Sequence, residues 1–252
     1  MPYEDAKDTI MHRVMRLVAH GLARGRLNME VTGLHHVPAR GPAILVARHF
    51  HHLFDGVALH WAIARRIHLF VTVDWATDPF TRFFMEAVIR AARWPMVLRA
   101  DALERRAQSA GLQSRSEFTA ADLSRYQRRA IHDSIALLRE GRILVIFPEG
   151  YPNIDPHYTP KIHAQEMLPF KSGFAAIAAA AEKRLGASIP LVPVGIRYTV
   201  DARWTAHVSF GAPLSAGDFV TRGSLVKKLE QDVAALSTMS PRGENSGDDG
   251  NP

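Results

Sequence analysis

The chain contains no cysteine among its 252 residues. That absence excludes a disulfide scaffold, a thiolate nucleophile and zinc or iron–sulfur sites built on cysteine. Lysine is scarce as well, because only six of the 31 Lys and Arg residues are lysines. No stretch reaches about 18 apolar residues without a charge, so we expect no transmembrane helix. Residues 1–8 mix charges without an apolar run, so no secretory signal peptide is expected either.

The composition that remains is that of a globular protein, with 47% hydrophobic and 22% charged residues. The formal net charge is +6 and arises mainly from arginine. Guanidinium groups bind phosphates in a bidentate manner, which suits anionic lipid headgroups, phosphorylated substrates or nucleic acid. A compositional bias of the genome would explain the same arginines. No recognisable nucleic-acid-binding module is present, so we expect no nucleic acid partner.

Apolar runs typical of buried strands alternate along the chain with helical patterns. This alternation predicts an α/β fold with a mixed, mostly parallel central sheet flanked by helices. We expect an N-terminal amphipathic segment at 1–28, one domain at 29–236 and a disordered tail at 237–252. Residues 100–124 are polar and are expected to be irregular. The expected strands are 29–34, 43–48, 67–73, 96–98, 143–147, 189–198 and 207–210, and the expected helices are 9–24, 55–66, 80–92, 123–140, 172–185 and 222–236.

The helix expected at 9–24 carries an apolar stripe beside an arginine-containing face. This pattern is typical of helices that lie in a membrane interface. A helix that packs its apolar stripe on the core of its own domain shows the same pattern. The first interpretation predicts a peripheral protein on the cytoplasmic face of a membrane.

The first chemically unusual segment follows the strand at 43–48 and includes His49 and Asp55. Ligands of parallel sheets gather at the carboxyl ends of the strands, so these residues are candidates for a site. A carboxylate that binds one imidazole nitrogen leaves the other free to act as a general base. Together with His49, the histidines at 51 and 52 also suggest a metal site. Adjacent histidines point apart in an extended chain, however, and no carboxylate cluster accompanies them, so we expect no metal.

Two further strands end in residues that could bind a substrate. Arg99 follows the strand at 96–98 and could hold a phosphate through its guanidinium fork. Glu149 and Gly150 follow the strand at 143–147, where Glu149 could accept a hydrogen bond from a substrate hydroxyl or hold Arg99 in place. Taken singly, Arg99 could also form a surface salt bridge, and residues 148–150 could be a plain turn.

Taken in order, these segments resemble the 1-acylglycerol-3-phosphate acyltransferase family of phospholipid and glycerol acyltransferases. The resemblance covers about residues 10–215. The family's Asn-His-x4-Asp block is matched by residues 48–55, its strand ending in Arg by 97–99, its Phe-Pro-Glu-Gly-Thr-Arg block by 147–150, and its Val-Pro-Val strand by 192–194.

This resemblance implies the mixed α/β fold of glycerolphosphate acyltransferases. It also implies transfer of a fatty acyl group from an acyl-CoA or acyl-carrier-protein thioester to a hydroxyl of a lysophospholipid. In that reaction His49 is the general base and Asp55 orients it. Arg99 binds the phosphate of the acceptor, and Glu149 and Gly150 line the acceptor site. A thioester donor needs no metal and no further cofactor.

The sequence departs from the family pattern at two places. The spacing from His49 to Asp55 is one residue longer than the pattern, and His51 would give a spacing one residue shorter, so His51 is an alternative base. Tyr151 and Pro152 replace the Thr-Arg of the third block, and an acceptor other than lysophosphatidic acid is therefore plausible. A lipid-binding protein without catalysis and a thioester hydrolase remain alternative functions.

Overall fold

A computed structural model describes residues 2–74, 79–109, 119–156 and 158–238. Within these residues the main sheet has the strand order β1-β8-β7-β2-β6-β3, and only the β7–β8 pair is antiparallel. The predicted α/β class with a mixed, mostly parallel sheet flanked by helices is confirmed. The strands are β1 (Leu27–Thr32), β2 (Ala43–Ala47), β3 (Ile67–Leu69), β6 (Ile143–Ile146), β7 (Leu191–Val200) and β8 (Trp204–Phe210).

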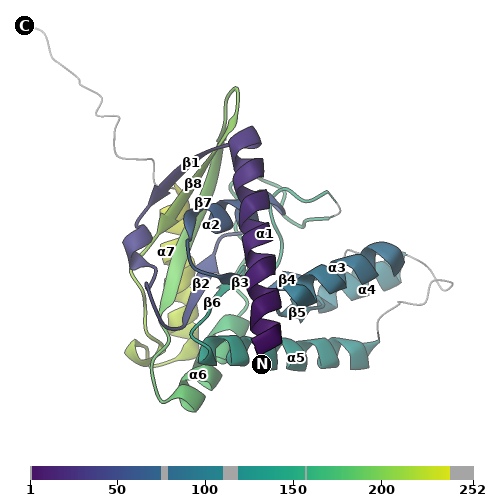
Figure 1. Ribbon diagram of the computed structural model, residues 1–252, viewed down its shortest axis with the longest axis vertical. Helices are drawn as coiled ribbons and strands as arrows, with labels where there is room; N and C mark the ends of the chain where they lie inside the picture. The colour runs from purple at the N-terminus through teal and green to yellow at the C-terminus, as the bar shows by residue number, and fades with distance from the viewer. Residues whose placement is uncertain (1, 75–78, 110–118, 157, 239–252) are drawn as a thin grey trace, which may run out of the picture.

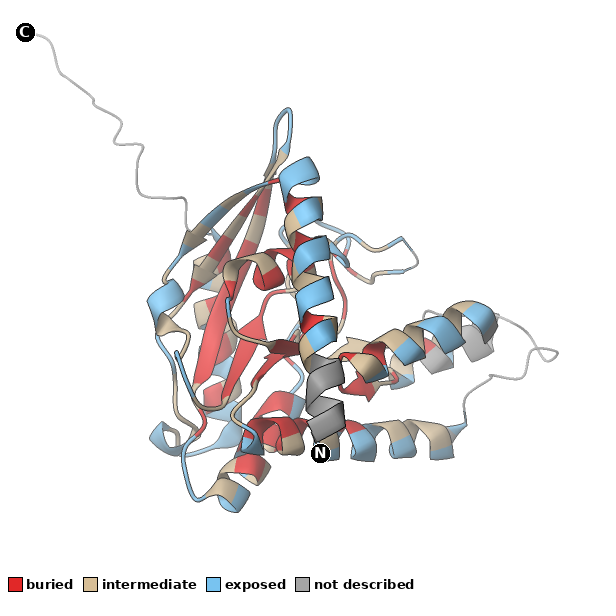
Figure 2. Cartoon of the chain, viewed as in Figure 1, coloured by how far each residue is buried: buried red, intermediate tan, exposed pale blue. Residues whose placement is uncertain are grey.

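Helices cover both faces of this sheet because its central strands are apolar on both sides (Figures 1 and 2). In β2, Leu45 packs with residues of α1 and α2, whereas its neighbours Ile44 and Val46 pack with residues of α5, α6 and α7. Every residue of β2 and β6 is buried, as expected for the centre of a parallel sheet. The helices are α1 (Pro2–Arg26), α2 (Phe54–Ala62), α5 (Ala120–Arg139), α6 (Gly173–Leu185) and α7 (Arg222–Thr238).

A smaller layer projects from the main sheet (Figure 1). It consists of the parallel pair β4 (Val71–Thr72) and β5 (Met96–Val97) with the helices α3 (Pro79–Ala91) and α4 (Ala100–Ser109). Its own apolar cluster is centred on Val73, Ile89, Met96 and Leu98. The single strand expected at 67–73 is therefore divided, because the chain leaves β6 after Leu69 and pairs with β5 from Val71.

The expectation of an irregular segment at 100–124 is wrong for most of its described part. Helix α4 occupies Ala100–Ser109, and α5 begins at Ala120. Thr119 caps α5, since its hydroxyl accepts the Asp122 N–H while the Asp122 carboxylate accepts the Thr119 N–H. The remainder of that segment, 110–118, lies outside the described residues, as does most of the tail expected at 237–252.

Helix α7 lies directly on β7, and Gly195 makes this approach possible. A Cβ atom at Gly195 would lie 2.4 Å from the carbonyl carbon of Leu236. A larger residue would therefore push α7 away from the sheet. Among the described helices, none has the length and apolar character needed to cross a bilayer.

Candidate active site

The candidate site forms where β2 and β6 end side by side. These strands are parallel neighbours, with Val46 aligned to Ile146, so the segments that follow them leave the same edge of the sheet. The His49 N–H donates a 2.8 Å hydrogen bond to Oε1 of Glu149, which joins the two segments directly.

His49 and Asp55 are in direct contact, with 2.9 Å between Nδ1 of the imidazole and Oδ2 of the carboxylate. The carboxylate accepts this bond, so Nδ1 carries the proton and Nε2 is left to accept one. The His49 ring stacks on Phe147, with ring centroids 4.4 Å apart. His49 also lines the cavity described below. The arrangement has the geometry of a general base oriented by a carboxylate.

Asp55 is completely buried in the first turn of α2, and its carboxylate is saturated with hydrogen bonds. Besides His49, its Oδ2 atom accepts the N–H groups of Phe50 (2.7 Å) and His51 (3.0 Å). Its Oδ1 atom accepts the hydroxyl of Tyr198, on β7, at 2.9 Å. Burial and the adjacent carboxylate raise the pKa of Tyr198 well above its usual value, so the phenol remains a donor. The extra residue in the His-to-Asp spacing is thus accommodated by a loop that folds around the carboxylate.

His51, the alternative base, has a different role in the fold. Its Nδ1 accepts the N–H groups of Leu53 and Phe54, each at 3.2 Å, at the start of α2. Burial, helped by the neighbouring His52, lowers the pKa of His51 to about 4. His51 therefore acts as an acceptor for otherwise unpaired N–H groups of a helix. The geometry favours His49 over His51 as the base.

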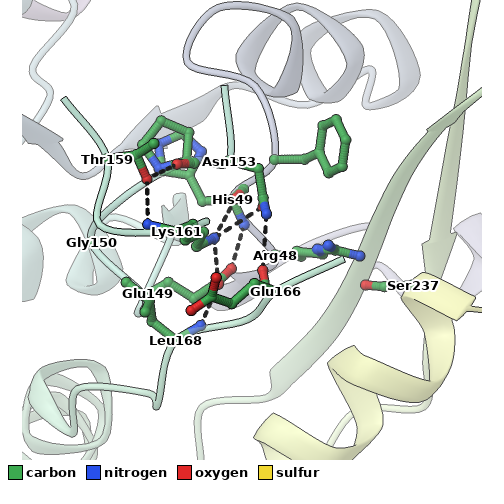
Figure 3. A network of polar contacts seen from close by, with 12 residues as sticks. Arg48, His49, Glu149, Gly150, Asn153, Thr159, Lys161, Glu166, Leu168 and Ser237 are labelled. Carbon is green, nitrogen blue, oxygen red and sulfur yellow. Dashed lines mark hydrogen bonds and ion pairs between the residues drawn. The ribbon is translucent and has the colours of Figure 1, made fainter. Parts of the chain in front are cut away.

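Glu149 does not face the cavity, which differs from its expected contact with the acceptor. Its side chain has 0% exposed area, and its two oxygens bind the protein itself (Figure 3). Oε1 accepts the N–H of His49, and Oε2 accepts the N–H of Leu168 at 2.9 Å and the ammonium of Lys161 at 2.5 Å. Glu149 does not hold Arg99 in place either, because a different carboxylate binds that guanidinium.

Arg48 is also buried rather than directed at a substrate. Its Nη2 donates to the carbonyl of Ala164 at 3.3 Å, and its guanidinium carbon lies 5.3 Å from the centre of the Phe50 ring. Burial lowers the pKa of Arg48, and the charges of Glu149 and Asp55 oppose that shift. The positive charge of Arg48 therefore lies in the protein interior next to His49 and is not directed at a substrate.

Arg99 lines the cavity but is firmly held by the protein. Its Nε and Nη2 both donate to Oδ2 of Asp74, at 3.0 and 2.8 Å, and its Nη1 donates to the carbonyl of Gly150 at 3.0 Å. The guanidinium also lies 4.1 Å from the centre of the Tyr151 ring. These bonds engage three of its five N–H groups, and an anionic group in the cavity would meet the others.

Gly150 brings the third segment against Arg99. It has a φ of 76°, a left-handed conformation that a glycine adopts without steric cost. A Cβ atom here would lie 3.4 Å from Nζ of Lys171, so the glycine also leaves room beside that ammonium. Both residues line the cavity.

Partly exposed charges surround Tyr151 at this end of the cavity. The Tyr151 hydroxyl donates to Oδ2 of Asp101 at 2.6 Å and accepts a bond from Arg105. Burial and the Asp101 carboxylate raise the pKa of Tyr151 to about 12. Lys171 lies 3.8 Å from the same carboxylate. Tyr151 occupies the place of the family's Thr, so this cluster replaces part of the pattern expected there.

A cavity of about 810 Å³ connects His49 with Arg99 and extends between α1, α2, α3 and α5. Its volume lies within the usual range for small-molecule sites. Apolar side chains dominate the wall away from His49, including Met15 and Leu22 of α1 and Ile89 of α3. The cavity is thus lined mainly by apolar side chains, together with an imidazole and a guanidinium.

Three contributing residues were not identified from the sequence: Asp74, Lys161 and Tyr198. Asp74 follows the strand β4, whose separation from the main sheet was not expected. Lys161 carried one usable signal, because lysine is rare in this arginine-rich chain. Tyr198 lies within an apolar strand pattern and gave no signal of its own.

Comparisons with known proteins identify a family and a similar fold. The model of the Acyltransferase family matches residues 28–197, a range that contains every candidate site residue. The fold is similar to that in the crystal structure of the 1-acyl-sn-glycerophosphate (LPA) acyltransferase PlsC from Thermotoga maritima. That match has a TM-score of 0.57 and 18% sequence identity, and it covers 92% of this chain and 80% of that chain. No curated protein matches the chain. Because the family model spans well over half of the sequence, the chain belongs to the Acyltransferase family.

Proposed function

We propose that this acyltransferase moves a fatty acyl group from an acyl-CoA or acyl-carrier-protein thioester to a free hydroxyl of a lysophospholipid. His49 is the general base and Asp55 orients it. The observation that carries this proposal is the 2.9 Å bond between the two side chains beside a large apolar cavity. The family and the fold support the reaction class, and the cavity suits a lipid chain.

The mechanism follows from the orientation of the imidazole. Nε2 of His49 takes the proton of the acceptor hydroxyl while the hydroxyl oxygen attacks the thioester carbonyl carbon. The negative charge of Asp55 stabilises the imidazolium that forms. The tetrahedral intermediate then collapses, the carbon–sulfur bond breaks, and the imidazolium returns the proton to the departing thiolate. Acceptor and donor thus yield an ester and a free thiol, and the base is regenerated.

The remaining N–H groups of Arg99 make it the proposed partner of the acceptor phosphate. Charge-assisted bonds from a guanidinium to phosphate are strong and directional. Asp74 fixes the orientation of the guanidinium and partly neutralises it. Lys171 supplies a second positive charge at the same end of the cavity.

The test is an assay of purified protein with acyl-CoA or acyl-carrier-protein donors and a panel of lysophospholipids. His49→Ala should lower kcat by about 1,000-fold or more, because the base and its proton transfer are lost. His51→Ala, the matched control on the same loop, should retain most of the transfer per folded molecule. Wild-type turnover by His49→Ala would refute the assignment. Release of free fatty acid without any acceptor would instead indicate a thioester hydrolase.

We also propose that the protein works at a membrane surface, on the cytoplasmic face for these donors. Two helices that line the cavity, α1 and α3, carry large exposed apolar side chains, and exposed arginines such as Arg13 accompany them on α1. Aromatic and aliphatic side chains beside cationic ones favour a bilayer interface. The exposed residues are Ile10, Val14, Leu17 and Val18 on α1 and Phe80, Phe83 and Phe84 on α3.

Point substitutions test this better than removal of α1, because Ala19 and Ala23 of α1 are buried in the main core. Leu17→Glu and Phe83→Glu should each weaken binding to phosphatidylglycerol vesicles by about 10-fold, since each removes a large apolar side chain from the interface. Val220→Glu is the matched control, because Val220 is fully exposed before α7. Equal binding by all three variants in a sedimentation assay would reject this surface.

A further inference from the structure

The segment between β6 and α6 buries the side chain of Lys161, although no helix or strand holds it there. The side chain has 0% exposed area. Burial of an ammonium group is costly unless each of its N–H groups finds a partner. Nζ contacts the carboxylate of Glu149 at 2.5 Å, the carbonyl oxygen of His49 at 2.9 Å and Oδ1 of Asn153 at 3.1 Å. An ammonium has three N–H groups, so this one is fully bonded.

Lys161 and its partner Glu149 each bind the main chain of His49 (Figure 3). Its N–H donates to Oε1 of Glu149, and its carbonyl oxygen accepts from Lys161. Glu149 and Lys161 are themselves an ion pair. The pair therefore holds both polar groups of the His49 main chain, while Asp55 holds its side chain from another direction.

We propose that Lys161 is a positioning residue for acyl transfer, which with Glu149 fixes the main chain of His49 so that Nε2 faces the cavity. This inference rests on the proposed function, in which His49 is the base. Displacement of a catalytic group by about 1 Å can lower the rate of a reaction by about 100-fold. We therefore expect a fixed main chain at His49 to contribute about 100-fold to the rate.

The loop presents Lys161 already in place. The Asn153 amide donates to the carbonyls of His163, Ala164 and Glu166, which closes the turn that follows Lys161. The Lys161 N–H donates to the Thr159 hydroxyl at 3.2 Å. These loop bonds do not involve Glu149. The Lys161 ammonium therefore does not have to leave the solvent when the ion pair with Glu149 forms. Little conformational freedom is lost when it binds.

The test must separate positioning from folding, since removal of one partner leaves the other charge buried and unpaired. The absence of cysteine in the natural chain makes a site-specific chemical rescue possible. Lys161→Cys is alkylated in denaturant and refolded in two forms. With 2-bromoethylamine the thiol becomes a thioether with an ammonium at the position of Nζ. With 1-bromopropane it becomes a neutral thioether of the same length, with a methyl group at that position.

The neutral form should show a kcat about 100-fold below that of the natural protein, with KM values for donor and acceptor within about threefold. The ammonium form should regain at least 10-fold of that loss. Lys183→Cys, at an exposed position on α6, is carried through the same steps and should match the natural protein in both forms. A neutral Lys161 form with natural kcat, or an ammonium form that folds without recovery, would overturn the inference.

A second variant covers the case in which the neutral form does not refold. Glu149→Gln/Lys161→Met removes both charges, so no unpaired buried charge remains. Its kcat should fall by at least 10-fold while KM is retained, and a natural kcat would overturn the inference. His49→Ala is measured alongside. If His49→Ala is inactive while the Lys161 variants are fully active, only the positioning role fails; if His49→Ala is active, the proposed function itself fails.

Discussion

The two sides of the cavity hold their charged groups in different ways. On the side of His49, the charges of Asp55, Glu149 and Lys161 are buried, and each is bound to main-chain groups as well as to a partner. On the opposite side, Asp101 and Lys171 have side chains that are 44% and 59% exposed. Buried, fully bonded charges resist displacement, whereas exposed pairs contribute little and rearrange readily. We therefore expect a fixed base opposite an acceptor wall in which Asp74 holds Arg99 in place and only the exposed Asp101–Lys171 pair is adjustable.

The largest expected effect concerns Asp55, on the fixed side. Asp55→Asn keeps the shape of the side chain and acceptors for its N–H donors but removes the charge that stabilises the imidazolium. We expect kcat to fall by about 1,000-fold with small changes in KM. Tyr198→Phe is the matched control, because it removes one bond to the carboxylate and leaves the charge in place. A loss below 10-fold in Asp55→Asn would contradict the comparison.

The pH dependence of the free energy of unfolding should also reflect the buried groups on the side of His49. Burial lowers the pKa values of His51 and His60 to about 4, from the ordinary histidine value of 6.5. Between about pH 4 and about pH 6.5 the unfolded chain binds more protons than the folded chain. The free energy of unfolding therefore falls as the pH decreases through this range. We expect a loss on the order of 3 kcal/mol for the two histidines together after allowance for solvent screening.

Urea unfolding at a series of pH values measures this loss. His60→Gln should reduce the pH dependence, because its neutral side chain no longer gains a proton on unfolding. An unchanged slope in His60→Gln would show that other groups cause the acid sensitivity.

We expect substitutions in the acceptor wall to change mainly the KM for the acceptor. Arg99→Ala removes the proposed contact to the acceptor phosphate, and we expect the acceptor KM to rise by about 10-fold. The donor KM should change much less. Asp74→Asn is a useful companion, since it frees the guanidinium from its carboxylate and should favour acceptors with more negative charge. Equal increases in both KM values for Arg99→Ala would count against a role in binding the phosphate.

The smallest effect is expected at Tyr151. Tyr151→Phe removes the hydroxyl shared by Asp101 and Arg105, whose charges can bind water instead. We expect a stability loss of about 1 kcal/mol and less than a threefold change in kcat. Thermal unfolding together with the transfer assay gives both values. A change in kcat as large as that of Asp55→Asn would show that the wall is as rigid as the base.

The sequence was most informative where strands ended. Strand alternation and the order of the motifs led to His49, Asp55, Arg99 and Gly150. The structure brings His49, Arg99 and Gly150 to one cavity and holds the buried Asp55 against His49. His49, Asp55 and Gly150 lie close together because β2 and β6 are parallel neighbours that end at the same edge of the sheet.

Partners from distant segments could not be predicted in the same way. Lys161 lies in an irregular loop, and Asp74 lies beyond a strand that changes sheets, so neither has a periodic pattern that fixes its place. Glu149 was found for its position, but its side chain turns inward to the main chain of His49 and Leu168 rather than to a substrate. Local pattern specifies where a residue enters the fold, whereas the direction of a buried carboxylate depends on every donor around it.

Helix α1 has one further consequence for how a lipid would travel. Val18 is half exposed on the outer surface and also lines the cavity, and Met15 and Leu22 continue the same wall toward the interior. A single helix thus lines both the entrance and the wall of the cavity. An acceptor that entered along α1 would keep its hydrocarbon tail in contact with apolar side chains from the surface to the interior. Only its headgroup would contact Arg99.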